Sequence, residues 1–219
     1  MKIFNLNKTF DKFTLEIEEL DLSEKKIYGI LGANGCGKTT MMKCLAGVLE
    51  PTSGKFDYMG LQKTDITMIF RKPYLLHDTV LKNLVYPLKI RGIKPEQKLI
   101  EKYLGLANLN PKDYAPGLSS GEQQKLSFIR ALIFEPKLIF IDEGFSNMDI
   151  ESVGLFEDII LQKKGVATVV LISHQMSSVK RLCDYVFFMS QGKIEEQGKI
   201  EELLENPRTD SLKKYLRHS

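Results

Sequence analysis

Cysteine, long apolar runs and an excess of charge of one sign are all scarce in this sequence of 219 residues. The three cysteines, Cys36, Cys44 and Cys183, form no C-x-x-C pair, which indicates a reducing compartment without structural disulfides. The 31 basic and 28 acidic residues leave a formal net charge of +3. This balance is typical of a mixed, solvated surface and does not indicate a nucleic-acid partner.

Apolar segments are too short to place this chain in a membrane. The longest, Val166 to Ile172, cannot cross a bilayer. The first residues, Met1 to Lys8, lack the apolar region of a secretion signal. We therefore expect a cytoplasmic protein, which another chain would have to anchor if it works at a membrane. With 43% apolar composition, residues 1–219 are expected to form a single domain around one sizeable core, with a subdomain.

The segment Gly32–Thr39 fits the phosphate-binding pattern G-x-x-x-x-G-K-[ST] at every fixed position. The apolar run Ile27–Leu31 predicts a buried strand before it, and Thr39–Ala46 predicts a helix after it. Glycines let the backbone N–H groups wrap around phosphate, and the helix N-terminus adds partial positive charge. We predict a nucleoside triphosphate site with Mg²⁺ on the Thr39 hydroxyl. Its expected contacts are Gly32, Asn34, Gly35, Cys36, Gly37, Lys38, Thr39 and Thr40.

The remaining patterns predict an α/β fold, a P-loop NTPase core with a mainly parallel sheet. Alternating apolar residues predict an antiparallel β subdomain within residues 1–25. Helical spacing predicts an inserted helical subdomain at about residues 75–135. The other predictions are a turn at Pro51–Gly54, strands at Thr67–Phe70, Lys137–Ile141 and Val166–Ile172, a hairpin over Tyr185–Glu196, and a helical tail over Ile200–Leu216 broken at Asn206–Pro207.

Two acids follow the apolar run Leu138–Ile141. An acid at the end of such a strand lies beside the bound phosphates. Asp142 is expected to hold Mg²⁺, directly or through water, and Glu143 to accept a proton from the attacking water or to polarise it. The alternative is a strand that ends in a charged loop. The segment Leu118–Gln124 similarly predicts either a second anion-binding helix start or a Ser-Gly turn with an N-cap.

The order of phosphate loop, Leu-Ser-Ser-Gly-Glu, apolar-Asp-Glu and an isolated His174 after a strand resembles the ATP-binding subunit of ATP-binding cassette (ABC) transporters. The resemblance extends from Phe10 to the Gln191–Gly192 turn. It implies an ATP- and Mg²⁺-dependent ATPase in which two copies sandwich two ATP molecules head to tail. It also implies transmembrane permease subunits as partners, a solute-binding protein reached through the permease, and a location on the inner face of the cell membrane.

The same resemblance assigns roles to individual residues. The signature residues Ser119, Ser120, Gly121 and Glu122 would cap the γ-phosphate bound by the other copy. Ser146 and Asp149 would belong to the loop that crosses the dimer seam, with an N-cap before Ile150 as the alternative. His174 would contact the γ-phosphate. Phe10 would stack on adenine or, alternatively, be a core or sheet-packing residue. His77 and His218 have no such assignment and are expected to be solvated.

Several residues depart from the family pattern. Arg71 stands where the family has glutamine. A guanidinium cannot ligate a cation, so Arg71 would slow hydrolysis, replace a phosphate contact or point away. Ser120, Glu122 and Gln175 replace glycine, glutamine and an acid, and the first two are expected to tune the site. The Cys36 thiol, near a helix N-terminus and a lysine, would have a lowered pKa or act only as a spacer.

The direction of transport and the solute rest on weaker resemblances. The surface over Arg71 to Tyr86, including Tyr74, Leu75 and Leu76, would receive a helix of the membrane subunits, or would be ordinary subdomain core. This segment and Tyr86–Gly92 resemble compact importers of tungstate or other oxyanions. The alternatives are a compact exporter or lipid-extracting ATPase, a soluble ABC ATPase acting on DNA or ribosomes, a small-molecule kinase, and a slow or degenerate ATP-binding dimerisation module.

Overall fold

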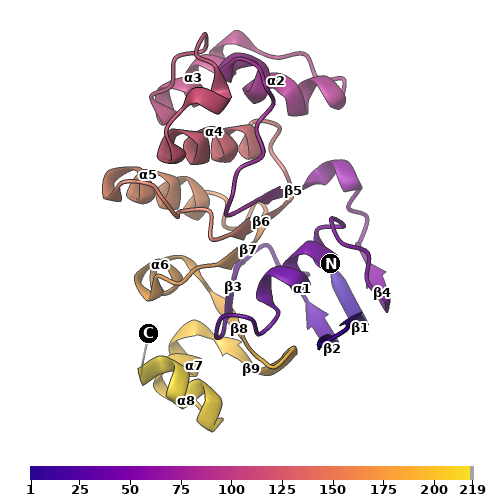
Figure 1. Cartoon of the computed structure of the whole chain (residues 1–219). Helices are drawn as coiled ribbons and strands as arrows, with labels where there is room; N and C mark the ends of the chain where they lie inside the picture. The colour runs from indigo at the N-terminus through magenta and orange to yellow at the C-terminus, as the bar shows by residue number, and fades with distance from the viewer. Residues whose placement is uncertain (218–219) are drawn as a thin grey trace.

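The computed structural model describes residues 1–217, and His218 lies outside the described residues (Figure 1). The strands are β1 (Lys2–Phe10), β2 (Phe13–Asp21), β3 (Ile27–Leu31), β4 (Ser53–Asp57), β5 (Ile66–Ile69), β6 (Leu138–Asp142), β7 (Thr168–Ile172), β8 (Tyr185–Ser190) and β9 (Lys193–Lys199). The α-helices are α1 (Lys38–Leu45), α2 (Val80–Ile90), α3 (Gln97–Ala107), α4 (Ser120–Leu132), α5 (Ile150–Leu161), α6 (Met176–Leu182), α7 (Ile200–Glu205) and α8 (Asp210–Arg217).

The central sheet has six strands in the order β5-β6-β7-β3-β8-β9. The first five are parallel, and β9 pairs with β8 in antiparallel orientation. Every residue of β3, β6 and β7 is buried, as expected for strands covered by helices on both faces. The mainly parallel sheet predicted from the sequence is confirmed. Its parallel strands carry the segments after β3, β5, β6 and β7 to one edge.

A separate antiparallel sheet, in the order β2-β1-β4, forms the N-terminal subdomain and confirms that prediction. Its β1–β2 hairpin turns at Asp11 and Lys12. The turn predicted over Pro51–Gly54 is wrong for Ser53 and Gly54, which begin β4. Ser53 pairs with Asn7 of β1, so the backbone of this segment is satisfied by a strand ladder instead of a local turn.

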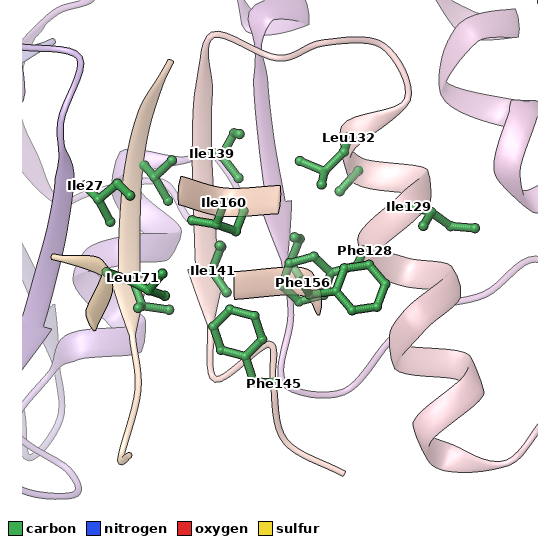
Figure 2. Packing of buried hydrophobic residues seen from close by; sticks show 14 of the residues in the cluster. Ile27, Phe128, Ile129, Leu132, Ile139, Ile141, Phe145, Phe156, Ile160 and Leu171 are labelled. Carbon is green, nitrogen blue, oxygen red and sulfur yellow. The ribbon is translucent and has the colours of Figure 1, made fainter. Parts of the chain in front are cut away.

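The helical subdomain is inserted between β5 and β6 and contains α2, α3 and α4, at the top of Figure 1. Its helices span residues 80–132, within the predicted limits. The Phe128 ring of α4 lies against the rings of Phe145 and Phe156, at centroid distances of 5.2 and 4.9 Å (Figure 2). All three are buried, and full burial of such a side chain contributes roughly 1.5–3 kcal/mol. This aromatic cluster therefore fastens α4 of the subdomain to the loop after β6 and to α5.

The C-terminal segment forms α7 and α8, with the predicted break at Asn206 and Pro207 between them. Leu203 and Leu212 are buried in the same core as the sheet, which explains why the helices pack back onto β8 and β9. Within residues 1–217, no helix combines the length and apolar character needed to span a membrane.

Candidate functional site

The phosphate loop joins β3 to α1, and two of its glycines are required by geometry. Gly37 is the N-cap of α1 at a φ of 108°, and a Cβ there would lie 2.8 Å from the Phe13 ring. Gly32 has a φ of 144°, and a Cβ there would lie 2.2 Å from the Met189 carbonyl oxygen. Any side chain would force the loop away from β2 or β8. The glycines thus keep the loop in a shape that only a bare backbone can adopt.

Lys38 supplies the cation of this loop. Its Nζ donates to the carbonyl oxygens of Gly32 at 2.7 Å and Ala33 at 2.9 Å, and the residue is 8% exposed. In the described structure no side chain caps the N-terminus of α1. An uncapped helix start with a lysine folded over the loop has free donors for an anion. This arrangement fits the predicted phosphate contacts.

A hydroxyl and a carboxylate meet beside this loop. Thr39 Oγ1 donates to Asp142 Oδ1 at 3.0 Å, which joins α1 to the end of β6. Burial raises the pKa of Asp142, and the hydrogen bond from Thr39 opposes that shift. Hard oxygen ligands of this kind suit Mg²⁺. The described residues contain no cluster of three or more His, Cys, Asp or Glu side chains around one point. The Thr39 hydroxyl and the Asp142 carboxylate fit an ion that takes its other ligands from phosphate and water.

Three neighbouring strands bring Arg71, Glu143 and His174 together, at the carboxyl ends of β5, β6 and β7. The Glu143 Oε2 lies 3.2 Å from Arg71 Nε, and its Oε1 lies 3.1 Å from His174 Nε2. The Glu143 backbone has a φ of 50°, and its N–H donates to the Ile172 carbonyl at 3.0 Å. A left-handed conformation is rare for glutamate, so the surrounding contacts hold this residue in a special position.

The start of α4 is closed by its own side chains. Ser119 is the N-cap, and its Oγ donates to Glu122 Oε2 at 2.6 Å while accepting from the Glu122 N–H at 3.4 Å. The Ser119 N–H also donates to Glu122 Oε2 at 2.9 Å. The N-cap alternative is therefore correct for this segment, with Ser120 as the first helical residue. The roles of these residues toward a second copy stay predictions.

The predicted seam loop lies directly beside α4. A Cβ on Gly121 would lie 2.8 Å from the Asn147 carbonyl oxygen, so only glycine allows this approach. Asp149 caps α5 by accepting from the Ser152 N–H at 2.8 Å, and it pairs with Lys125 of α4 at 3.3 Å. The Ser146 hydroxyl is buried without a hydrogen-bond partner among residues 1–217. The N-cap alternative for Asp149 thus holds, and the loop is held against α4.

For two residues of the nucleotide region, Phe10 and Cys36, the structure excludes one of the roles considered from the sequence. Phe10 is 44% exposed at the end of β1, so it is not a core residue. Its ring centroid lies 6.4 Å from that of Phe13 on β2, so the sheet-packing alternative stays open. Cys36 is buried, and burial raises the pKa of its thiol in spite of the opposing effect of Lys38. The lowered pKa predicted for Cys36 is therefore wrong, because a sequence shows a neighbouring cation but not the burial. Cys36 acts as a spacer in this structure.

Several positioning residues were not found from the sequence. The buried amide of Gln124 donates to the Phe70 carbonyl at 3.2 Å, and Arg130 Nη2 donates to the Tyr74 carbonyl at 2.6 Å. Asn83, also buried, bonds both the N–H and the carbonyl of Leu76 at 2.8 and 3.1 Å. Polar residues within an amphipathic helix carry no local signal of such distant partners. They fasten the segment after β5 to α2 and α4.

A cavity of about 940 Å³ beside the phosphate loop was also not predicted. It is lined by Ala33–Cys36 of the loop, the turn between β8 and β9, and α8. Gly192 allows this turn to approach β2, since a Cβ there would lie 2.1 Å from the Thr14 carbonyl oxygen. The C-terminal helix therefore forms one wall next to the loop.

Comparisons with known proteins identify the family of this chain. The family described as ABC transporter matches residues 15–146. The chain belongs to the ABC transporter family. It is 36% identical over 206 residues to the tungstate uptake system ATP-binding protein TupC of Peptoclostridium acidaminophilum, covering 89% of this chain and 96% of that protein. It is 30% identical to the phosphate import ATP-binding protein PstB of Saccharolobus solfataricus, covering 98% and 95% of the two chains.

Solved structures support the same fold. An ATP-binding subunit of an ABC transporter superposes with a TM-score of 0.86 at 20% identity, covering 99% of this chain and 98% of that chain. A dimeric, post-hydrolysis ATP-binding cassette with bound ADP and phosphate superposes with a TM-score of 0.78 at 21% identity, covering 91% and 98%. The fold class and the family resemblance predicted from the sequence are confirmed. This ABC chain is an ATP-binding subunit and an ATPase.

Proposed function

We propose that this chain hydrolyses ATP to drive import of a solute, tungstate or another oxyanion, through separate membrane subunits. The observation that carries the proposal is the meeting of Lys38, Thr39 and Asp142 with the Glu143–His174 pair at one edge of the parallel sheet. This edge brings a phosphate site and a general-base candidate together. The solute assignment is supported by the 36% identity to a tungstate uptake protein.

The proposed chemistry is positioning and charge stabilisation. Lys38 and the loop N–H groups bind the phosphates, and Thr39 and Asp142 hold Mg²⁺, which would offset phosphate charge when bound. Glu143 takes a proton from the attacking water, and His174 orients the γ-phosphate from the other side of the carboxylate. The Nε2 of His174 lies 3.1 Å from Glu143 Oε1, so the two side chains are within hydrogen-bond distance of each other. Phe10, which is exposed, stacks on adenine.

A second copy of the chain would complete the site. The start of α4, with Ser119 and Gly121, would cap the γ-phosphate bound by its partner, and the loop from Ser146 to Asp149 would cross the seam. Exposed apolar residues support such an interface, because Ile150, next to this loop, is 92% exposed. Loss of the γ-phosphate contacts on hydrolysis would open the dimer and supply the movement.

The membrane subunits would dock on the helical subdomain from the cytoplasmic side. Tyr74 and Tyr86 are 72% and 43% exposed, and Leu76 is also exposed, so these residues are not subdomain core. Leu75 is half-buried and packs against the core. This surface suits an apolar helix end of a permease. A solute-binding protein would act through that permease.

Glu143→Gln tests the chemistry. A general base contributes about 10²–10⁴-fold to a rate, so Mg-ATP hydrolysis by the isolated variant should fall by at least about 100-fold while ATP binding is retained. Wild-type specific activity should rise with protein concentration, as expected when two copies form each site. Glu101→Gln, an exposed acid of α3, is the matched control and should leave turnover unchanged. Undiminished turnover in Glu143→Gln would contradict the assignment.

The transport role is tested with the permease in sealed vesicles. ATP-dependent uptake of tungstate supports the solute assignment. Uptake of another solute, with tungstate ignored, contradicts that assignment but leaves the ATPase role intact. Leu76→Asp should uncouple uptake while the isolated chain still hydrolyses ATP, because the charge lies only on the proposed docking surface.

A further inference from the structure

We propose that Arg71 is a positioning residue that holds the Glu143 carboxylate in a resting orientation and must release it before hydrolysis. This inference rests on the proposed role of Glu143 as general base. Arg71 Nε lies 3.2 Å from Glu143 Oε2. Of the three roles open for Arg71 at the level of sequence, the contact favours the one that slows hydrolysis.

The contact follows from strand register. Ile69, the last residue of β5, pairs with Ile141 of β6, so the segments that leave these two strands with Arg71 and Glu143 start side by side. Asp142 pairs with Ile172 of β7, so the segment that carries His174 leaves the sheet on the other side of Glu143. The pairing therefore has its origin in the sheet and not in a chance approach of two surface side chains.

Both oxygens of the Glu143 carboxylate are engaged in this arrangement. Oε1 faces His174 Nε2 at 3.1 Å, and Oε2 faces the guanidinium of Arg71. A water that gives its proton to Glu143 must reach one of these oxygens. His174 has its own proposed contact with the γ-phosphate, whereas Arg71 cannot ligate Mg²⁺. Arg71 therefore competes with the water for the lone pairs of Glu143 Oε2, and its departure frees that oxygen.

Exposure makes such a movement inexpensive. The Arg71 side chain is 69% exposed, whereas that of Glu143 is 15% exposed. An ion pair with one solvated partner is weak, and salt screens it further. Glu143 is held by the backbone around it, so the guanidinium can swing out while the carboxylate stays in the site.

The segment that carries Arg71 is attached to the helical subdomain. The Phe70 carbonyl accepts from Gln124 of α4 at 3.2 Å, and the Tyr74 carbonyl accepts from Arg130 of the same helix at 2.6 Å. Glu143 belongs to the sheet. A shift of α4 relative to the sheet would therefore move the backbone on both sides of Arg71 and draw the guanidinium from Glu143. The exposed Tyr74 and Leu76 would let a docked permease favour the same release.

Arg71→Ala tests the proposal on the isolated chain, at a protein concentration where specific activity has levelled off. The Mg-ATP kcat should rise by about two- to fivefold, the weight of an exposed ion pair, with the KM for ATP changed by less than about twofold. Arg71→Lys, which keeps the charge, should give a smaller rise. The ratio of variant to wild-type turnover should fall toward one as salt is added, because screening weakens the wild-type pair. A structural role would not produce this salt dependence.

Lys98→Ala is the matched control, since it removes an exposed cation of α3 away from the site and should not change turnover. An unchanged kcat in Arg71→Ala would overturn the proposal, and so would the absence of measurable ATP turnover in both the wild type and the variant. A fall in kcat with a raised KM would also overturn it and would identify Arg71 as a phosphate contact. Glu143→Gln separates the two assignments. If Glu143→Gln retains turnover, the assignment of Glu143 as general base is wrong. If Glu143→Gln loses turnover and Arg71→Ala leaves it unchanged, Glu143 remains the base and only the proposed role of Arg71 is wrong.

Discussion

The two helix starts that face phosphate in the proposed mechanism differ in how their N-terminal donors are used. At α1 the N-cap is Gly37, and no side chain of the described structure caps the helix. At α4 the N-cap is Ser119, and the carboxylate of Glu122 accepts from both its backbone N–H and its hydroxyl. The start of α1 is therefore open for an external anion, whereas the start of α4 is already occupied by the Glu122 carboxylate.

This difference between the two helix starts suits tight binding of ATP by one chain and weaker association of two chains. An open helix start beside Lys38 can bind triphosphate within a single chain. At α4 a phosphate from the partner copy would have to compete with Glu122 for Ser119, so closure would be weaker and easier to reverse. A switch needs this inequality, because a dimer that closed as tightly as the loop binds nucleotide would not reopen.

The largest expected effect breaks the open site. Lys38→Ala removes an ammonium that is 8% exposed and bonded to two loop carbonyls. Hydrogen bonds to charged groups are worth about 1.5–3 kcal/mol each, so the loss of phosphate contacts should weaken ATP binding by about 100-fold or more. Equilibrium binding of a fluorescent ATP analogue measures this change. Lys55→Ala, on β4, is the control with the same change in charge, and equal weakening in both variants would contradict the prediction.

A sequence predicts those features of the two helix starts that depend on residues close together in the chain. The phosphate loop is predictable, because its glycines, Lys38 and Thr39 are contiguous and follow a strand of five buried residues. The cap at α4 is also local, since Ser119 and Glu122 are three positions apart. The strand β4 was not predicted, because its exposed residues show no alternation and its pairing with β1 lies far away in sequence.

Long-range contacts of the site have no local signal at all. The pair Arg71–Glu143 depends on the register of β5 against β6, and the tether from Gln124 to Phe70 depends on how α4 packs. The family resemblance identified Arg71 as a residue that departs from the family pattern, but it did not predict which side chain Arg71 contacts. Of the two alternatives for Cys36, the lowered thiol pKa is wrong for the same reason, because burial is a property of the folded chain.

A smaller effect is expected at the closed site. Ser119→Ala removes the N-cap of α4, which should cost about 0.5–2 kcal/mol of folding stability. Binding of ATP by the single chain should not change, whereas ATP-driven association should weaken by about tenfold through loss of a bond to phosphate. Analytical ultracentrifugation with Glu143→Gln as the background measures association. Thr209→Ala, which removes the equivalent bond to the Leu212 N–H at α8, should lose stability alone. Weaker association in that control as well would assign the effect to stability.

Glu122→Gln, with the smallest expected effect, makes α4 more like α1. Hydrogen bonds from Ser119 lower the pKa of Glu122, so its contribution to stability is present at neutral pH and is lost as the pH falls through its lowered pKa. A glutamine keeps the cap but removes the charge that competes with phosphate. A charge at a helix N-terminus is worth about 0.3–1 kcal/mol, so ATP-driven association should tighten by about two- to fivefold. Glu101→Gln is again the control. Weaker association in Glu122→Gln would mean that the carboxylate assists closure, and the contrast between the two helix starts would then be one of stability and not of competition for phosphate.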